Sequence, residues 1–433
     1  MSSIGGSPTT VCFDARRLGA HGVGRHARSI LNHLVPLAHH LHFHVICKPE
    51  GIAWLQDVSG ADNVTLHLDP TEILSFEECL AIGRLLSESP GDLVHLPTQL
   101  IPPFFEAPFV VTIHDLMHLQ YPSFLPSADQ LREAYGSEAI RDMRKVLDTM
   151  GRDYGPASHE PRATSTAGGE FGGEEVPISA YVGSLLPILA TKATLVLAVS
   201  AFVKKCLQEQ FGVDPTKVLV VHNSADEIFQ MVTNRAQVAH QLRLLGAPAR
   251  YFLFVGRWRP HKNLGLLLKS YTALRSSGKE IPRLVLVTRP DRDLGVENAL
   301  LAQLRDDGHA IVFEGCDDAH LSVLYNGALA LVAPSVIEGF DLPVVEAMAC
   351  GTPVLLSSIP AHKEVAGRAG IFFSPHDSKT LTRLLLEASE AEKEELMSSD
   401  VLIGRARLFS WERSAQLTLG AYQIAMRLSE GRS

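Results

Sequence analysis

Short apolar runs alternate with amphipathic stretches along the first part of the chain, up to about Phe105. The run Val11–Asp14 predicts a strand, and apolar residues from Val23 to Leu34 then recur at helical spacing. Further strands are predicted at four later runs: His42–Lys48, Asn63–Leu68, Asp92–Leu96 and Phe109–Asp115. Strands that alternate with helical segments indicate parallel βαβ units.

The same alternation of predicted strands and helices starts again near Gly246 and continues to Phe409. Further strands are predicted at Tyr251–Gly256, Arg283–Thr288, Ala310–Gly315, Leu329–Ser335 and Pro353–Ser358. The pattern therefore predicts two α/β domains, residues 8–235 and residues 246–409. Residues 410–433 have helical periodicity, and we expect this segment to pack back across the two domains.

A low-complexity segment interrupts the first domain at residues 151–177. It is rich in Gly, Ser, Thr, Pro and Glu and has almost no aliphatic residues. Such a composition cannot offset chain entropy by burial, so the sequence predicts a disordered or loosely held insertion.

One apolar stretch, Ile178–Val203, resembles a membrane span. Pro187 and Lys192 lie near its middle, and a central lysine is costly in a bilayer core. A helix ending near Lys192, followed by a buried strand at Ala193–Val199, explains the stretch as well. The first residues are polar and lack the features of a signal peptide. We therefore expect a soluble, cytoplasmic protein.

Composition and charge narrow the function classes. Of 433 residues, 46% are hydrophobic and 20% charged, so the chain can bury substantial cores. The net charge of −9 argues against a nucleic-acid partner, which would require a basic surface. The six cysteines are scattered without a CxxC pair, which favours a reducing compartment over a zinc or disulfide framework.

The segment SVIEGFDLPVVEAMACGTPVLLSS carries the clearest chemical pattern. Glu338 and Glu346 are eight positions apart, Pro343 suits a first helical turn, and Gly351 with Pro353 marks a helix end. This places Glu338 in a loop after a strand and Glu346 one turn into a short helix. A helix N-terminus offers free N–H groups to a diphosphate, and a nearby carboxylate accepts hydrogen bonds from sugar hydroxyls. An ordinary turn with Glu346 as a solvated helix residue is the alternative.

This segment, EGFDLPVVEAMACGTPV, resembles the E-x7-E signature of retaining glycosyltransferases of family 4. Four further segments resemble that family in the expected order: FDARRLGAHGVGRHARSIL, FVVTIHDLMHLQYP, LVLAVSAFVKKCLQEQFGVDPTKVLVVHNSAD and VGRWRPHKNLGLLLKSY. The resemblance spans nearly the whole chain except residues 136–178. It implies an α/β protein of the GT-B fold, in which two Rossmann-like, doubly wound parallel-sheet domains face a cleft.

The resemblance also implies roles for individual residues. Arg257 and Lys262 would hold a donor diphosphate, because departure of a nucleoside diphosphate concentrates negative charge that fixed cations stabilise. Glu346 would bind the ribose and Glu338 the donor sugar. His114 would lie beside the sugar and the reacting centre. The expected catalytic residues are His114, Glu338, Arg257 and Lys262. The expected donor-binding residues are Gly22, Gly24, Arg257, Lys262, Glu338, Gly339, Phe340, Asp341, Leu342 and Glu346.

Asp341 departs from the family pattern, which usually has glycine at this position. An aspartate tolerates unusual backbone angles better than most residues. Its negative charge near a diphosphate is expected to weaken donor binding or to alter donor choice.

The sequence predicts no metal and no cofactor besides the nucleotide sugar itself. The histidine-rich run His39–His44 places alternate histidines on one strand face, without a second cluster to complete a metal site. No DxD carboxylate pair follows a strand, which fits metal-independent transfer.

The expected activity is transfer of a hexose to a saccharide or lipid-linked glycan. Mannose from GDP-mannose is the expected donor, because the His-Asp-Leu segment resembles mannosyl-transferring members. Two alternatives remain: a nucleotide-sugar 2-epimerase of the same architecture, and a non-catalytic nucleotide-sugar-binding member.

The helix predicted at Ala139–Met150 either contacts the inner face of a membrane peripherally or packs against the core as an ordinary amphipathic helix. Neither the acceptor nor the oligomeric state is indicated.

Overall fold

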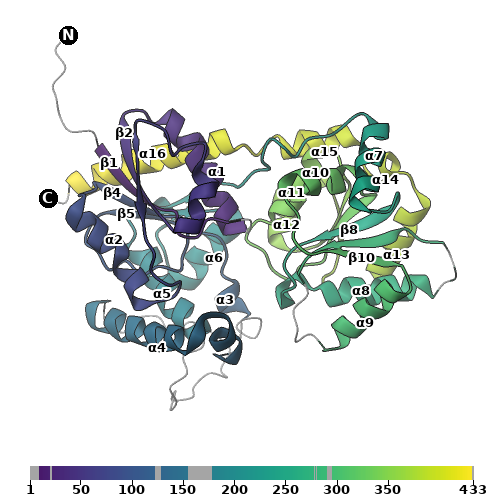
Figure 1. Ribbon diagram of the computed structural model, residues 1–433, viewed down its shortest axis with the longest axis horizontal. Coiled ribbons are helices and arrows are strands. Elements are labelled where there is room, and N and C mark those ends of the chain that lie inside the picture. Colours follow the sequence, from purple (N-terminus) through teal and green to yellow (C-terminus); the bar gives the residue numbers. More distant parts are fainter. Residues whose placement is uncertain are drawn as a thin grey trace, which may run out of the picture. The chain divides into compact units, whose positions relative to one another are not determined.

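The computed structural model describes residues 9–19, 22–121, 128–154, 178–276, 278, 280–289 and 295–431. The chain forms two compact units (Figure 1). Unit 1 comprises the chain up to His222 together with the segment from Trp411 onward, and unit 2 comprises Asn223–Ser410. Most of the predicted insertion, residues 155–177, lies outside the described residues.

Unit 1 is built on a parallel seven-stranded sheet of order β3-β2-β1-β4-β5-β6-β7. Its strands are β1 (Thr9–Asp14), β2 (Leu41–Cys47), β3 (Val64–Leu68), β4 (Leu93–Leu96), β5 (Phe109–Ile113), β6 (Leu195–Ala198) and β7 (Val218–Val220). The central strands β4, β5 and β6 are buried at every position, which is why they appear in the sequence as continuous apolar runs.

The helices of unit 1 connect these strands. They are α1 (Gly22–Leu37), α2 (Phe76–Glu88), α3 (Met117–Gln120), α4 (Ala128–Tyr154), α5 (Ile178–Lys192), α6 (Ala201–Phe211) and α16 (Trp411–Glu430), with 3-10 turns η1 (Pro49–Leu55) and η3 (Pro215–Lys217). The predicted helix ending near Lys192 and the strand after it are confirmed as α5 and β6. Within the described residues, no helix combines the length and apolar character needed to cross a membrane.

The last helix, α16, belongs to unit 1, where it lies alongside α1 (Figure 1) and also contacts β4, β5 and β6. Its Tyr422 is fully buried, and the Tyr422 hydroxyl lies 2.6 Å from His95 Nδ1 on β4. His95 Nε2 lies 3.0 Å from Thr112 Oγ1 on β5. Burial lowers the pKa of His95 to about 3, so this histidine is neutral and serves as a hydrogen-bonding element of the core.

Unit 2 contains a parallel six-stranded sheet of order β10-β9-β8-β11-β12-β13. Its strands are β8 (Tyr251–Val255), β9 (Arg283–Val287), β10 (Ala310–Phe313), β11 (Ala330–Ala333), β12 (Val354–Ser357) and β13 (Gly370–Phe373). Its helices are α7 (Arg235–Leu245), α8 (Leu264–Arg275), α9 (Gly295–Asp306), α10 (Asp318–Gly327), α11 (Leu342–Ala349), α12 (Pro360–Ala366), α13 (Ser378–Glu390), α14 (Lys393–Leu396) and α15 (Ser399–Ala406), with 3-10 turns η4 (Pro260–Lys262) and η5 (Gly367–Ala369).

The division between the units falls at His222, earlier than residue 235, where the first predicted domain ends. The stretch after His222 is held by side chains of unit 2. Asn326 Oδ1 accepts a hydrogen bond from the amide of Val232 at 2.7 Å, and Asn326 Nδ2 donates to the Gln230 carbonyl at 3.0 Å. The following helix, α7, packs on α10. The hydrophobic pattern could not reveal this boundary, because the stretch between His222 and α7 has no hydrophobic periodicity.

Candidate active site

The carboxyl edge of the unit 2 sheet carries a lysine folded back against a glycine. Gly256 directly follows β8 and has φ 155°, and a Cβ at this position would lie 3.2 Å from Cε of Lys262. The loop between them ends in η4, whose last residue is Lys262. Glycine is therefore required here, both for its backbone angle and for the close approach of the lysine stem.

The Lys262 ammonium lies between two carboxylates. Its Nζ is 2.8 Å from Glu338 Oε1 and 2.9 Å from Asp341 Oδ1. Burial by itself lowers the pKa of Lys262, but Asp341 and Glu338 outweigh it and raise the pKa above its ordinary value. Lys262 is therefore a fixed cation at the start of α11.

Asp341 is the residue from which α11 begins, and it adopts the left-handed conformation with φ 76° and ψ 80°. Its second carboxylate oxygen, Oδ2, lies 2.9 Å from Nε2 of His362 on α12. Burial alone would raise the pKa of Asp341, but Lys262 and His362 lower it below its usual range. The charge that departs from the family pattern is thus paired on both oxygens.

Glu346 lies on the buried side of α11 and is 1% exposed. Its Oε2 accepts a hydrogen bond from the Tyr325 hydroxyl on α10 at 2.9 Å. The alternative of a solvated helix residue is therefore wrong. A carboxylate held at a fixed position inside the domain is suited to recognise a specific hydroxyl.

The remaining predicted residues of unit 2 do not join the ion pairs. Gly339, Phe340 and Leu342 are buried, and the Phe340 ring packs edge-on against Phe409 with centroids 5.4 Å apart. Arg257 is exposed, and the described part of the chain offers it no hydrogen-bond or ion-pair partner.

The other predicted residues, Gly22, Gly24 and His114, belong to unit 1. Gly22 opens α1, and a Cβ on Gly24 would lie 2.5 Å from the Gly19 amide nitrogen and 2.7 Å from the Arg17 carbonyl oxygen. This glycine allows the loop after β1 to pass directly over the first turn of α1.

His114 follows β5 and is held from two sides. Its Nε2 donates to the Pro97 carbonyl at 2.8 Å, and its ring packs edge-on against His26 at 4.8 Å. Burial lowers the pKa of His114, so the neutral ring carries its proton on Nε2.

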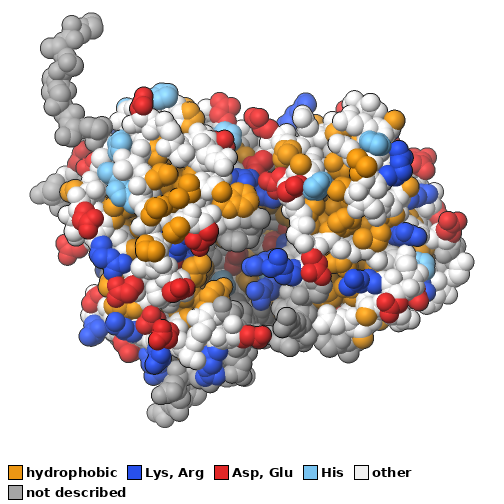
Figure 2. Space-filling model, in the orientation of Figure 1, with side chains coloured by type: hydrophobic (Ala, Val, Ile, Leu, Met, Phe, Trp, Pro, Cys, Tyr) orange, Lys and Arg blue, Asp and Glu red, His pale blue; other side chains and the backbone are white. Residues whose placement is uncertain are grey.

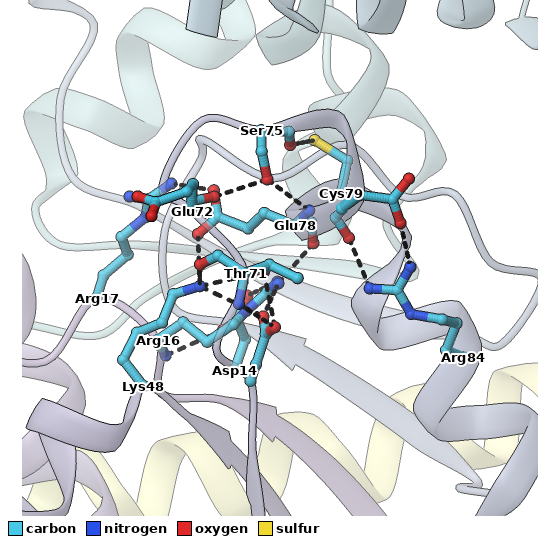
Figure 3. A network of polar contacts seen from close by, with 12 residues as sticks. Asp14, Arg16, Arg17, Lys48, Thr71, Glu72, Ser75, Glu78, Cys79 and Arg84 are labelled. Atoms are coloured by element: carbon cyan, nitrogen blue, oxygen red, sulfur yellow. Dashed lines mark hydrogen bonds and ion pairs between the residues drawn. The ribbon is translucent and has the colours of Figure 1, made fainter. Parts of the chain in front are cut away.

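A buried ion network, which the sequence analysis did not identify, lies at the carboxyl ends of β1, β2 and β3 (Figure 3). Arg16 Nη2 is 2.8 Å from Asp14 Oδ2, and Arg16 Nη1 is 3.0 Å from Asp69 Oδ2. Arg17 Nη2 is 2.8 Å from Glu78 Oε2 on α2. The network fixes the loop that passes over Gly24. Its sequence signal was the pair Arg16-Arg17, which begins two residues after the end of the first predicted strand.

The amphipathic helix predicted at Ala139–Met150 is part of α4, which packs against α2 and α5. Ile140, Met143 and Met150 are buried, so the apolar face is covered by unit 1 itself. Figure 2 shows Lys and Arg side chains interspersed with Asp and Glu over the region of α4. In unit 1 this helix packs against the core, which is the second of the two alternatives.

One histidine of the run His39–His44 lies beside a histidine of the neighbouring strand. His44 Nδ1 on β2 lies 2.9 Å from His67 Nε2 on β3. Across the described ranges, however, no group of three or more His, Cys, Asp or Glu side chains is arranged to hold a metal ion.

Comparison with known proteins defines the class of fold first. The chain aligns with the solved sucrose-phosphate synthase of Thermosynechococcus elongatus with a TM-score of 0.66 and 17% identity, over 98% of this chain and all of that chain (100%). Together with the two parallel sheets, this likeness confirms the predicted GT-B fold class with two Rossmann-like domains.

Residues 249–390 match the family model described as Glycosyl transferases group 1. The chain is 30% identical over 238 residues to O-antigen chain mannosyltransferase B of Escherichia coli, covering 54% of this chain and 61% of the relative. It is also 30% identical over 204 residues to O-antigen chain mannosyltransferase RfbU of Salmonella typhimurium, covering 46% and 52%. The alignments thus span little more than half the length of these relatives.

Proposed function

We propose that the protein is a retaining, metal-independent glycosyltransferase that moves mannose from GDP-mannose to a saccharide or lipid-linked glycan. The observation that carries this proposal is the partly buried cluster of Lys262, Glu338 and Asp341 at the start of α11, inside the segment that matches Glycosyl transferases group 1. The names of the mannosyltransferase relatives support the choice of sugar.

The cluster suits the chemical step. In the transfer, the bond between the sugar C1 and the diphosphate oxygen breaks, and a bond from C1 to an acceptor hydroxyl oxygen forms. The diphosphate leaves with the electron pair and takes up the acceptor's proton. Lys262 and the amides at the start of α11 would stabilise the departing charge without a metal ion. Glu338 and Glu346 would bind hydroxyls of the sugar and of the ribose.

Lys262 is the residue whose removal tests the donor site. In Lys262→Ala, binding of GDP-mannose should weaken roughly 10- to 100-fold, because a charge-assisted contact to the diphosphate is lost. Binding of GDP-mannose, UDP-glucose and ADP-glucose is measured by calorimetry, and transfer is measured by the glycosylated product. Lys269→Ala is the matched control, because Lys269 lies exposed on α8.

The outcomes separate the candidate functions. Binding of one nucleotide class, lost in Lys262→Ala and kept in Lys269→Ala, supports the proposed donor site. Equal binding in both variants contradicts it. Conversion of the donor sugar to an isomer in the absence of any acceptor would indicate an epimerase instead.

A further inference from the structure

The charges around Asp341 balance only when His362 is protonated. Glu338 and Asp341 contribute two negative charges and Lys262 contributes one positive charge. His362 is fully buried and contacts the second oxygen of Asp341. An imidazolium at this position brings the cluster to neutrality, and a neutral imidazole leaves it with one uncompensated negative charge.

The hydrogen bonds of His362 require a proton on Nδ1. This atom lies 3.0 Å from the Ser357 carbonyl oxygen and 3.1 Å from Ser357 Oγ. A carbonyl oxygen can only accept, and the Ser357 hydroxyl gives its own hydrogen to the Ser335 carbonyl. Both partners of Nδ1 are therefore acceptors.

The other ring nitrogen also faces an acceptor. Nε2 lies 2.9 Å from Asp341 Oδ2, and Asp341 is ionised because the Lys262 ammonium, 2.9 Å from its other oxygen, holds its pKa low. An ionised carboxylate has no hydrogen to donate. With donors required at both nitrogens, the ring is an imidazolium.

Asp341 is the charged side chain that contacts this ring within the described residues. The other charged groups on α12 and on the elements packed against it are Glu346, Lys363, Glu364, Arg368 and Arg405. Glu346 accepts from Tyr325, and Arg405 donates to the Val365 carbonyl. The protonation of His362 is thus tied to Asp341.

We propose that His362 is a positioning residue of the donor site, whose imidazolium balances Asp341 so that Lys262 presents its positive charge to a nucleotide-sugar diphosphate. This inference rests on the proposed function. It goes beyond it by making donor affinity depend on the pair of Asp341 and His362, of which His362 lies outside the predicted site.

The first measurement is the Kd of GDP-mannose for the wild-type protein and for variants of the pair, all at the same pH. Loss of the imidazolium should weaken binding about tenfold or more. One uncompensated unit charge a few ångströms from the diphosphate has an effect of at least that order at an effective dielectric constant of about 20.

Three variants isolate the pair. His362→Gln leaves the negative charge of Asp341 uncompensated, so binding should be weak. Asp341→Asn removes the charge that requires compensation, so binding should be at least as tight as in wild type. The double variant should recover the binding lost in His362→Gln. The matched control is His320→Gln, because His320 Nδ1 lies 3.0 Å from Asp317 Oδ1 in an exposed pair, and it should keep the wild-type affinity.

Two results would overturn the inference in different ways. If the wild-type protein binds GDP-mannose and His362→Gln binds it equally well, or if the double variant does not recover binding, the role of His362 is wrong and the proposed donor site stands. If neither GDP-mannose nor UDP-glucose or ADP-glucose binds the folded wild-type protein, both proposals fail. Should His362→Gln not fold, the affinity of Asp341→Asn decides the question, because binding weaker than wild type would contradict the role of His362.

Discussion

At the scale of single residues, Asp341 links the stability of unit 2 to pH. Its pKa in the folded protein is lower than in an unfolded chain, where an aspartate titrates near about 3.9. A carboxylate of this kind stabilises the folded state above its unfolded pKa, and the stabilisation disappears as the pH falls through the folded pKa.

We therefore expect Asp341→Asn to be less stable than wild type near neutral pH, by roughly 1–3 kcal/mol for a lost charged contact. The difference should shrink steadily below about pH 4, because the carboxylate of the unfolded wild-type chain then takes up a proton that the folded protein does not bind. Urea unfolding of both proteins at several pH values measures the difference. A gap that stays constant down to about pH 2 would show that the ion pairs contribute nothing to folding.

At this scale the sequence predicted those site residues that belong to a recognisable local segment of the chain. Glu338, Lys262 and Asp341 were all predicted, and the left-handed conformation of Asp341 agrees with the tolerance of aspartate for such angles. His362 was not predicted, because its contact with Asp341 depends on how α12 packs beside α11. The sequence signal for such a partner was Asp341 itself, because a carboxylate in an apolar segment with no basic residue beside it requires a cation from elsewhere.

At the scale of elements, the Tyr325 hydroxyl joins α10 to α11 through Glu346. Tyr325→Phe should lower the free energy of unfolding by roughly 1–3 kcal/mol, because a buried carboxylate loses a donor. It should also weaken GDP-mannose binding several-fold, roughly the effect of one hydrogen bond. Calorimetric titration and urea unfolding measure the two effects.

Tyr251→Phe is the control for this prediction. The Tyr251 hydroxyl donates to the Leu324 carbonyl at 2.7 Å, in the same domain and equally buried, but it contacts no predicted site residue. This variant should lose stability and keep its donor affinity. A parallel loss of affinity in both variants would mean that Glu346 has no special part in binding.

The contact between the β1–α1 loop and α1 gives a second prediction for elements. Gly24→Ala should destabilise unit 1 by roughly 1–3 kcal/mol, because the new methyl group would meet backbone atoms of Gly19 and Arg17 that cannot move freely. Gly420→Ala on α16 has open space around it and should be stabilising by roughly 0.5–1 kcal/mol. Thermal unfolding of the two variants compares them, and equal stability would contradict the close packing at Gly24.

Most strands were predictable because a strand buried on both faces is a continuous apolar run. The exceptions are β7, which has only three residues, and β13, Gly370–Phe373, which begins with glycine and is only partly buried at three of its four positions. Both lie at the edge of a sheet, which removes the pattern that identifies a central strand. The ion network at the ends of β1, β2 and β3 was missed for another reason, since it unites loops that are distant in sequence.

At the scale of the whole molecule, unit 2 is one continuous piece of chain, whereas unit 1 is completed by α16. A fragment of residues 223–410 should therefore fold alone and bind GDP-mannose. A fragment ending at His222 should lack cooperative unfolding, because it loses the packing of α16 on α1 and the buried contact between Tyr422 and His95. Circular dichroism during heating distinguishes the two fragments, and cooperative unfolding of the shorter fragment would contradict the role of α16.

The position of α16 has a consequence for biosynthesis. A ribosome that has finished the last strand of unit 1 must still translate all of unit 2 before Trp411 appears. At about 5–20 residues per second this delay lasts on the order of ten seconds or more. The surface of α1, β4 and β5 that receives α16 stays uncovered during that interval, so the domain that is synthesised first is the one that matures last.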